Sequence, residues 1–425
     1  MRILRAEYVL PISSEPIANG AVAIDGNRIA TVGPAAEIRS MFPGAAEIDL
    51  GIAAILPGFV NCHSHLEVTS MRGALDNVEH DFGAWLLKLN DLRSEMSPAD
   101  IEAAALLGAR EGAAAGVTCF GDIGRFGEAG LKALKTVGLR GVLFQETEFS
   151  PDETTATIDF EKLKEKFVTL RGQQTELVEI GISPHATYTV SRKLFELIAA
   201  YAIDEKIKLA IHAAEAAEED SLLLGGEGLF AGLFRELGVN WKVPHCRPVE
   251  FLASTGVLEA RPLLAHCVRV THDDIETIVT SGSRIAHCPK SNAKFGHGTA
   301  PLEEFLNAGI ATGLGSDSVA SNNLCDLLEE ARFAAFAARN RNDRTRFLSA
   351  RDVLETATLG GARALGLEDK IGSLEAGKQA DITVVAIGSL SQTPVSDVEA
   401  ALVFSSNARD VVMTLVAGEQ IYAVR

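Results

Sequence analysis

Short apolar runs alternate with amphipathic or alanine-rich stretches through the middle of the chain. The apolar runs are typical of buried strands and the stretches between them of helices. We predict eight strands, at Ala54–His65, Val117–Ile123, Arg140–Thr147, Leu177–His185, Lys208–Glu215, Pro262–Arg269, Arg284–Ser291 and Ala311–Ser318. The predicted helices include Pro98–Ala115, Phe126–Val137, Ser191–Asp204, Asp273–Thr280, Pro301–Ala308 and Asp326–Arg339. This repeated alternation predicts an α/β fold, a (β/α)8 TIM barrel.

Most of these predicted strands end in a titratable or hydrogen-bonding residue. The residues are His63 and His65, Asp122, Gln145, His185, His212, His266, Ser291 and Asp317. Barrel enzymes place their chemistry at the carboxyl ends of the strands. The distribution therefore favours a catalytic barrel over a doubly wound sheet.

The two ends of the chain have a different pattern. Residues 1–56 are predicted as short strands, and residues 366–425 contain two alternating runs, Ile382–Ala386 and Val411–Val416. We expect a small β-sandwich domain assembled from both termini, with the barrel at residues 57–365 inserted between them. The segment Ala216–Glu259 is longer than the usual connection, and we expect it to form helical insertions over the mouth of the barrel.

Composition and charge narrow the class of protein. A net charge of −18 repels phosphate backbones and anionic lipids, which argues against nucleic-acid and membrane partners. The first residues lack the apolar core of a signal peptide, so we expect a cytoplasmic protein. The six cysteines show no C-x-x-C spacing, which argues against a disulfide framework. Because neighbours on a strand face opposite ways, Cys62, Cys267 and Cys288 are expected to point away from the barrel axis.

Four of the polar residues suit one metal ion. His63 and His65 lie at i and i+2, so on a strand they share a face. His212 and Asp317 end the fifth and eighth predicted strands. Three imidazoles and one carboxylate suit Zn²⁺, or Fe²⁺ by the same ligand logic. Taken singly, His212 also fits a buried core histidine and Asp317 a helix N-cap, but their common place at the rim favours one divalent metal ion.

Two further residues are candidates for acid–base chemistry. Glu215 follows His212 by three residues, where it can approach the water without binding the metal. The next acidic residues, Glu218, Glu219 and Asp220, are expected at the surface. His266 can orient the attacking water, although a core histidine is the alternative. Glu215, His266 and Asp317 are the catalytic candidates. The fourth predicted strand ends in His185, not in a lysine that could bridge two metals, so one metal is expected.

The ordered set of motifs resembles the amidohydrolase superfamily. It comprises the H-x-H after Pro57-Gly58-Phe59, His212-x-x-Glu215, Leu264-Ala265-His266-Cys267, His287–Asn292 and Ser316-Asp317-Ser318. The likeness is to the branch of nucleoside and nucleobase deaminases and triazine chlorohydrolases. It implies the metal ligands and catalytic residues named above. It also implies that His185 contacts the substrate and that Trp85 lies over it, with a core tryptophan as the alternative for Trp85. Homodimers are common in this branch.

Several segments bear on the substrate. Deaminases of S-adenosylhomocysteine carry an arginine where Gln145 stands, and glutamine lacks the charge that holds a substrate carboxylate. The His65-Leu66-Glu67 run, Gln145-Glu146 and Phe295–Gly298 resemble aminodeoxyfutalosine deaminases. Glu67 and His297 are candidates for the distal part of that substrate, with surface or supporting roles as the alternative.

Together these features predict a metal-dependent hydrolytic deaminase. Its substrate would be an aminated purine nucleoside, of the aminodeoxyfutalosine or the methylthioadenosine and adenosine type. A chlorohydrolase, an amide hydrolase or a guanine- or cytosine-type deaminase on the same scaffold is the alternative, because the same chemistry attacks any suitable electrophilic carbon. A third possibility is a binding barrel without activity. The H-x-E and P-C-x-x-C pair of cytidine deaminases is absent, which disfavours that fold.

Overall fold

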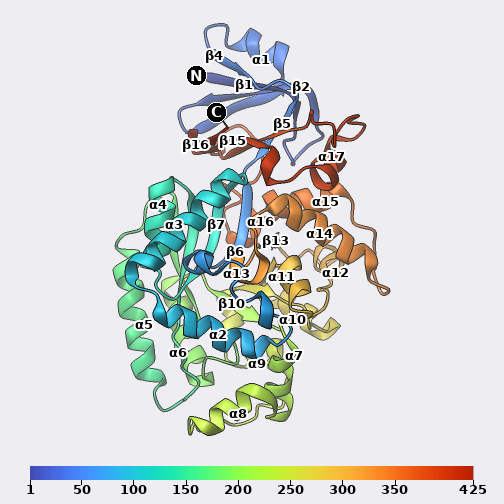
Figure 1. Cartoon of the computed structure of the whole chain (residues 1–425). Coiled ribbons are helices and arrows are strands. Elements are labelled where there is room, and N and C mark those ends of the chain that lie inside the picture. Colours follow the sequence, from blue (N-terminus) through green and yellow to red (C-terminus); the bar gives the residue numbers. More distant parts are fainter. Residues whose placement is uncertain (425) are drawn as a thin grey trace.

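A closed barrel of parallel strands lies at the centre of the computed structural model, which describes residues 1–424 (Figure 1). Its strands are β6 (Phe59–Ser64), β7 (Val117–Gly124), β8 (Arg140–Glu146), β9 (Val178–Ser183), β10 (Ala210–Ala213), β11 (Leu263–His266), β12 (Arg284–His287) and β13 (Thr312–Leu314). They pair in sequence order as two four-stranded sheets, β6–β9 and β10–β13. Parallel bridges between Ile182 and Leu209 and between Ser64 and Asp317 close the ring. The predicted TIM barrel is confirmed.

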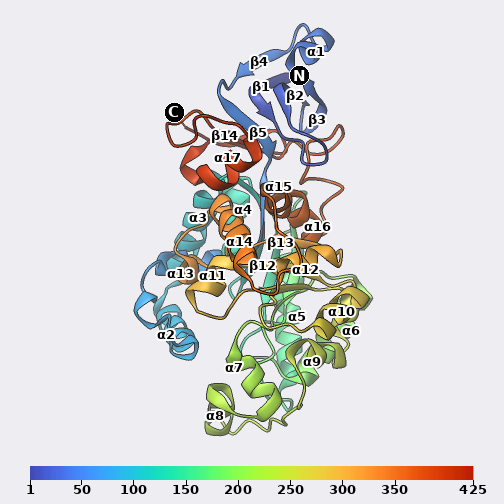
Figure 2. The ribbon, with the colours of Figure 1, turned by 90° about the vertical axis from the view of Figure 1, so that its right-hand side faces the viewer.

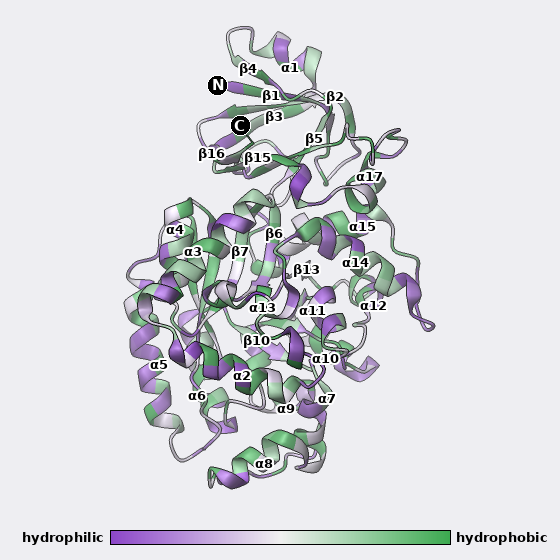
Figure 3. Cartoon of the chain, viewed as in Figure 1, coloured by the Kyte–Doolittle hydropathy of each residue, from purple (hydrophilic) through white to green (hydrophobic). Residues whose placement is uncertain are grey.

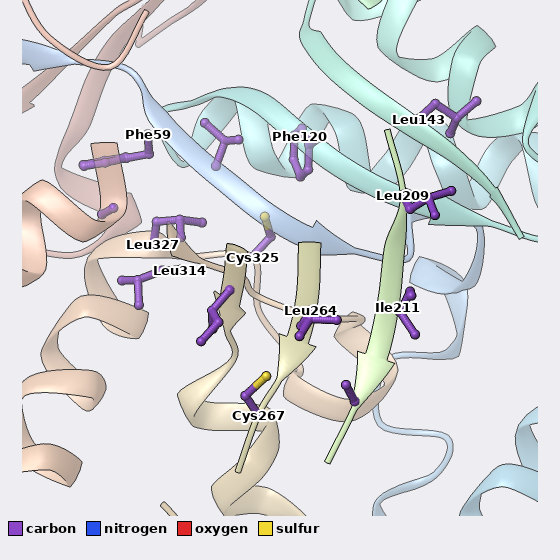
Figure 4. Close-up of a cluster of buried hydrophobic side chains, with 14 of the residues drawn as sticks. Phe59, Phe120, Leu143, Leu209, Ile211, Leu264, Cys267, Leu314, Cys325 and Leu327 are labelled. Carbon is purple, nitrogen blue, oxygen red and sulfur yellow. The ribbon is translucent and has the colours of Figure 1, made fainter. Parts of the chain in front are cut away.

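Helices surround this barrel, and all of those named next except α5 lie close to a predicted helix. They are α3 (Pro98–Ala114), α4 (Glu128–Val137), α5 (Ala156–Arg171), α6 (Arg192–Glu205), α10 (His272–Ser281), α12 (Leu302–Asn307) and α14 (Leu327–Asn340). Capping boxes fix the starts of α3 and α10 at Ser97 and Thr271. The outer faces of the strands pack against these helices in the main hydrophobic core. Figure 4 shows part of that layer, with Leu209, Ile211 and Leu264 projecting from their strands.

Both termini build the small domain, as predicted. Its eight-stranded sheet runs in the order β16 (Glu419–Ala423), β15 (Val411–Val416), β14 (Ile382–Ala386), β5 (Ala53–Pro57), β1 (Arg2–Val9), β2 (Ile17–Asp25) and β3 (Arg28–Pro34), with β4 (Ala46–Asp49) on β1. Ile29 of β3 and Leu415 of β15 lie in one hydrophobic cluster although their strands are far apart in this order. The sheet is therefore curled around its own core. Helix α1 (Ala35–Met41) lies beside β2 and β3, and α17 (Val398–Ser405) lies between β14 and β15 in the sequence. The helices α15 (Ala350–Glu355) and α16 (Gly361–Leu365) belong to the barrel, where α16 packs against β6 and β13.

A buried ion pair ties the two parts together. Arg140, at the start of β8, donates to Asp381 beside β14 through Nε at 2.8 Å and Nη2 at 3.0 Å. Asp381 also accepts from the backbone N–H of Ala417. Figure 2 shows the small domain at one end of the molecule and α7 (Ala217–Asp220) and α8 (Gly228–Glu236) at the other. Among residues 1–424, no helix is both long and apolar enough to cross a membrane.

The segment after β10 is helical, as predicted. It contains α7, α8 and α9 (Pro248–Ser254). Much of α8 is coloured as hydrophobic in Figure 3, whereas α5 on the outside of the barrel is largely hydrophilic. Leu229, Phe230 and Leu233 of α8 line the cavity described below. This insertion therefore forms part of the cavity wall.

The first predicted strand, Ala54–His65, is two strands in two different sheets. β5 belongs to the small domain and β6 to the barrel, with Gly58 between them. A Cβ at Gly58 would lie 2.1 Å from the side chain of Thr118, so only glycine fits this close passage. The Pro57-Gly58 dipeptide between the two strands is the sequence signal of this change of sheet, and the single predicted strand ran across it.

Candidate active site

Four side chains from three parts of the chain converge at the carboxyl ends of the barrel strands. His63 lies in β6 and His65 directly after it, His212 lies in β10, and Asp317 follows β13. The Nε2 atoms of His65 and His212 are 3.2 Å apart. Asp317 Oδ1 lies 3.4 Å from His63 Nε2 and 3.6 Å from His65 Nε2. The proposed metal ligands are thus brought together.

Neighbouring groups aim these four side chains at one point. Nδ1 of His65 donates to the carbonyl of Ile123 at 3.1 Å, and Nδ1 of His212 donates to the carbonyl of His185 at 3.0 Å. A carbonyl only accepts, so each Nδ1 carries the proton and each Nε2 has its lone pair free. Asp317 Oδ2 accepts from two serine hydroxyls, those of Ser291 and Ser321, at 2.6 and 2.8 Å. Its other oxygen is left facing the imidazoles.

Burial sets the charge states that a metal ion needs. It lowers the pKa of His63 to about 4 and that of His65 to about 3, so both rings are neutral near pH 7. Burial by itself would raise the pKa of Asp317. The nearby imidazoles, His63 first among them, outweigh it and hold that pKa well below its ordinary value. Neutral imidazoles with an ionised carboxylate are the forms that bind divalent metals.

The spacing fits a tetrahedral divalent ion. Metal–nitrogen distances of about 2.0–2.1 Å in a tetrahedron place ligand atoms about 3.3 Å apart, close to the separations given above. His63 Nε2 is buried and has no hydrogen-bond partner among the described residues. A buried nitrogen without a partner is costly in a folded protein unless something such as a metal ion occupies its lone pair. The donor set and its geometry therefore suit zinc.

Two of the three cysteines beside the histidines do not point away from the barrel axis, contrary to prediction. Cys62 lies in a cluster with residues from β7, β8, β10, β11 and β12, which places it inside the barrel. Cys288 shares a group of potential ligand atoms, all within 4.8 Å of one another, with His63 and His266. Only Cys267 packs in the outer layer.

Glu215 and His266 adjoin the metal centre. His266 Nε2 lies 3.6 Å from Glu215 Oε1, and its Nδ1 lies 2.8 Å from Asn292 Oδ1. His297 Nε2 lies 3.8 Å from the same Glu215 oxygen. Burial raises the pKa of Glu215 to about 8, so near pH 7 its carboxyl group is able to carry a proton. The site thus holds a proton donor beside three metal-facing imidazoles.

The backbone at this rim is unusual. Ala214, His266 and Asp317 have φ values of 49°, 73° and 55°, in the left-handed region that non-glycine residues seldom adopt. Such conformations cluster at functional sites because the surrounding structure must hold them. They also explain why the predicted strands extended too far: here the chain leaves the sheet at these residues.

Contrary to prediction, two of the acidic residues after Glu215 are buried. Glu219 is fully buried and Asp220 is buried as well. Glu219 accepts from Thr187 Oγ1 at 2.6 Å and from the backbone N–H of Glu215 at 3.0 Å. Glu219 therefore fixes the backbone of the proposed proton donor, which the sequence pattern did not indicate.

A cavity of about 700 Å³ opens onto the metal centre. His65, His212, Glu215, His266 and Asp317 line its inner end. Its wall is largely apolar and includes Trp85, Phe149, Tyr188, Leu229, Phe230, Leu233 and Phe295. A mostly apolar cavity of this size with a few polar groups is typical of a small-molecule site.

The predicted substrate-binding residues fall into two groups. His185 and Trp85 line the cavity, and His297 packs beside it against Phe82. Glu67 and Gln145 do not belong to the cavity lining. Glu67 accepts from the backbone N–H groups of Arg125 and Phe126, and Gln145 donates to the carbonyls of Arg125 and Glu146. The structure thus gives these two side chains a supporting role in the loop after β7.

The sequence analysis missed five charged residues of the cavity wall, which are Arg93, Arg125, Glu146, Glu148 and Glu236. Arg93 lies in α2 (Phe82–Glu95), Arg125 follows β7, and Glu146 ends β8. Strand alternation indicates that Glu146 faces the barrel interior, because Val142 and Phe144 lie four and two residues before it and their side chains are inside the barrel. No local pattern distinguishes the two arginines from surface residues.

Comparisons with known proteins agree with this geometry. The amidohydrolase family matches residues 54–421, and a bacterial imidazolonepropionase-like composite domain matches residues 20–45. A 5-methylthioadenosine/S-adenosylhomocysteine deaminase from Moorella thermoacetica is 32% identical over 424 residues, which cover 98% of this chain and 92% of that relative.

Solved structures with similar folds include deaminases. An adenosine deaminase from Xanthomonas campestris with bound zinc has a TM-score of 0.85 and 28% identity, over 98% of this chain and 92% of that one. Helicobacter pylori aminofutalosine deaminase, in complex with methylthio-coformycin, has a TM-score of 0.84, over 99% of this chain and 100% of that one. Its identity is 20%, so this second likeness supports the fold alone.

Proposed function

The chain belongs to the amidohydrolase family, and we propose that it is a metal-dependent hydrolytic deaminase. It would remove the exocyclic amine of an aminated purine nucleoside and release ammonia. The observation that carries this proposal is the convergence of His63, His65, His212 and Asp317 beside Glu215, at the inner end of a cavity of about 700 Å³. The deaminase relative from Moorella thermoacetica, at 32% identity, supports the substrate class.

We assign the metal to His63, His65, His212 and Asp317, with zinc as the expected ion. The zinc in the adenosine deaminase from Xanthomonas campestris supports that choice. When bound at such a site, a divalent ion activates a water molecule by lowering its pKa to about 7. The remaining steps depend on side chains of this chain.

Two residues are placed to move protons, and a third is placed to stabilise charge. Asp317 is the base for the attacking water and passes that proton to the amine as it leaves, and two serine hydroxyls on its Oδ2 hold the carboxylate in place. Glu215, protonated near pH 7, donates to the ring nitrogen next to the carbon that is attacked. His266, fixed by Asn292, stabilises the charge that develops as ammonia leaves.

His185 and Trp85 line the cavity and are proposed to contact the substrate. A cytoplasmic location is supported by the six cysteines, which are all free thiols. The homodimer and the domain boundaries at residues 56/57 and 365/366 stay predictions.

Ammonia release from zinc-loaded protein tests the function. The panel is aminodeoxyfutalosine, methylthioadenosine, S-adenosylhomocysteine, adenosine, guanine and a chlorinated triazine. We expect one equivalent of ammonia for each adenine nucleoside consumed, and no release by a His212→Asn variant. Turnover of guanine alone, or chloride release from the triazine without turnover of any nucleoside, would reject the proposal.

A further inference from the structure

Glu330 of α14 is a buried acidic residue outside the cavity. Its side chain is fully buried, and it does not belong to the cavity lining. The neighbouring Glu329 is partly exposed and pairs with the Lys290 ammonium at 2.5 Å, whereas the Glu330 carboxylate lies 3.9 Å from that ammonium. A buried carboxylate is costly unless its oxygens are hydrogen-bonded, so the partners of Glu330 show what it holds in place.

One oxygen of Glu330 holds the turn that contains Asp317. Asn322, the last residue of α13 (Val319–Asn322), donates from Nδ2 to Glu330 Oε1 at 2.5 Å and to the carbonyl of Ser316 at 2.6 Å. Both hydrogens of this amide are therefore used. The Ser316 carbonyl belongs to the peptide that leads into Asp317, whose φ of 55° lies in the left-handed region that non-glycine residues seldom adopt. Through Asn322, Glu330 thus supports a backbone conformation that needs support.

The other oxygen of Glu330 holds the helix that carries Ser291. This helix is α11 (Pro289–Lys294), and the backbone N–H of Lys290 donates to Glu330 Oε2 at 3.3 Å. The next residue, Ser291, donates its hydroxyl to Asp317 Oδ2 at 2.6 Å. The second hydrogen bond of Glu330 therefore fixes the backbone directly before a side chain that holds the Asp317 carboxylate.

The same relation holds for the second serine on Asp317. Ser321, which donates to Asp317 Oδ2 at 2.8 Å, directly precedes Asn322. The two hydrogen bonds of Glu330 thus lead to the two serines that orient one carboxylate. We infer that Glu330 is a positioning residue, which sets the direction of the Asp317 carboxylate from outside the cavity. The inference rests on the proposed function, because that function assigns Asp317 as a metal ligand and as the base.

Glu330→Gln tests the inference, because glutamine keeps the size of the side chain but only one of its two acceptor oxygens. Groups that hold metal ligands typically contribute about 10- to 100-fold to metal affinity or activity. We expect kcat for ammonia release at saturating zinc to fall by that factor, with KM within about threefold of wild type. Zinc affinity, measured by competition with a chelator, should fall by a similar factor. In protein loaded with Co²⁺, the visible absorption bands should shift, because they report the arrangement of the ligands.

Glu329→Gln is the matched control, because it removes the adjacent carboxylate of the same helix, which pairs with the Lys290 ammonium. Its kcat and zinc affinity should stay within about threefold of wild type, and its cobalt spectrum should be unchanged. Asn322→Ala breaks one of the two connections and leaves the Glu330 carboxylate in place. It should lower zinc affinity and shift the cobalt spectrum in the same direction as Glu330→Gln, and it keeps the test decisive where Glu330→Gln does not fold.

Unchanged zinc affinity and an unchanged cobalt spectrum in the folded variants would overturn the inference, even with a lower melting temperature, because Glu330 would then only stabilise the fold. Equal losses in Glu329→Gln would overturn it as well. Both results leave the deaminase intact when the wild type releases ammonia. The zinc and cobalt measurements need no substrate. If they change as expected while the wild type releases no ammonia from any nucleoside, the deaminase is rejected and the positioning role of Glu330 is kept.

Discussion

Replacing Glu215 with glutamine separates proton transfer from metal binding. The side chain is buried, and its Oε1 lies 3.6 Å from His266 Nε2 and 3.8 Å from His297 Nε2. Glutamine has nearly the same size and polarity, so the packing should persist. It cannot give up a proton, and positioned general acids contribute about 100- to 10,000-fold to a rate. We therefore expect kcat to fall by about that factor, equivalent to roughly 3–5 kcal/mol.

The assay combines steady-state ammonia release with metal analysis of the same protein. Because Glu215 is not among the four ligands, zinc content should match that of the wild type. Glu218→Gln removes a carboxylate three residues away that does not line the cavity, and its kcat should stay within about threefold of wild type. A loss of less than tenfold in Glu215→Gln, or a loss of activity in proportion to lost zinc, would refute the proposed role of Glu215.

Three further outcomes follow from the structure. Asp381→Asn leaves the buried charge of Arg140 without its partner, so denaturant unfolding should show about 3–5 kcal/mol of lost stability; a loss below 1 kcal/mol would contradict this. Burial raises the pKa of Glu219 from 4.5 to about 8. Between these two pH values the folded protein therefore keeps a proton on Glu219 that the unfolded chain has released. Stability should therefore fall as pH rises from about 5 to 8, by up to about 1.4 kcal/mol per unit, and Glu219→Gln should remove that part of the slope. In the wild type, chelation should abolish ammonia release and lower the melting temperature, and added zinc should reverse both effects. In His63→Ala, neither chelation nor added zinc should change the melting temperature.

The barrel and most of its helices were predictable because their signals are local. The predicted helix Pro98–Ala115 is α3 (Pro98–Ala114), whose start is fixed by the Ser97 capping box and the proline that follows it. The convergence of His212 and Asp317 was predictable for a different reason. Residues that end parallel strands meet at one rim of a closed barrel, however far apart they are in sequence.

The cavity wall was less predictable because it is built by contacts between distant segments. Arg93 and Arg125 are two ordinary arginines in sequence, and only the packing of α2 over the barrel brings them to the same wall. Gln145 was preferred over Glu146 on resemblance to a family position. The alternation of side chains along β8 instead places Glu146 on the inner face of the strand, because it lies two residues after the inward-facing Phe144.

The surroundings of His63, the first proposed metal ligand, show where strand alternation fails as a guide. On a regular strand, Cys62 and His63 would face opposite sides, so a histidine at the metal centre would turn the cysteine outward. In β6, however, the register with β7 shifts between Asn61 and Ser64. Cys62 lies inside the barrel with Val60, and His63 still reaches the metal centre. Such an irregularity is defined by the pairing of two strands and not by either sequence alone. The H-x-H motif therefore predicts two histidines that converge with His212 and Asp317, but it gives no information on the face of the neighbouring cysteine.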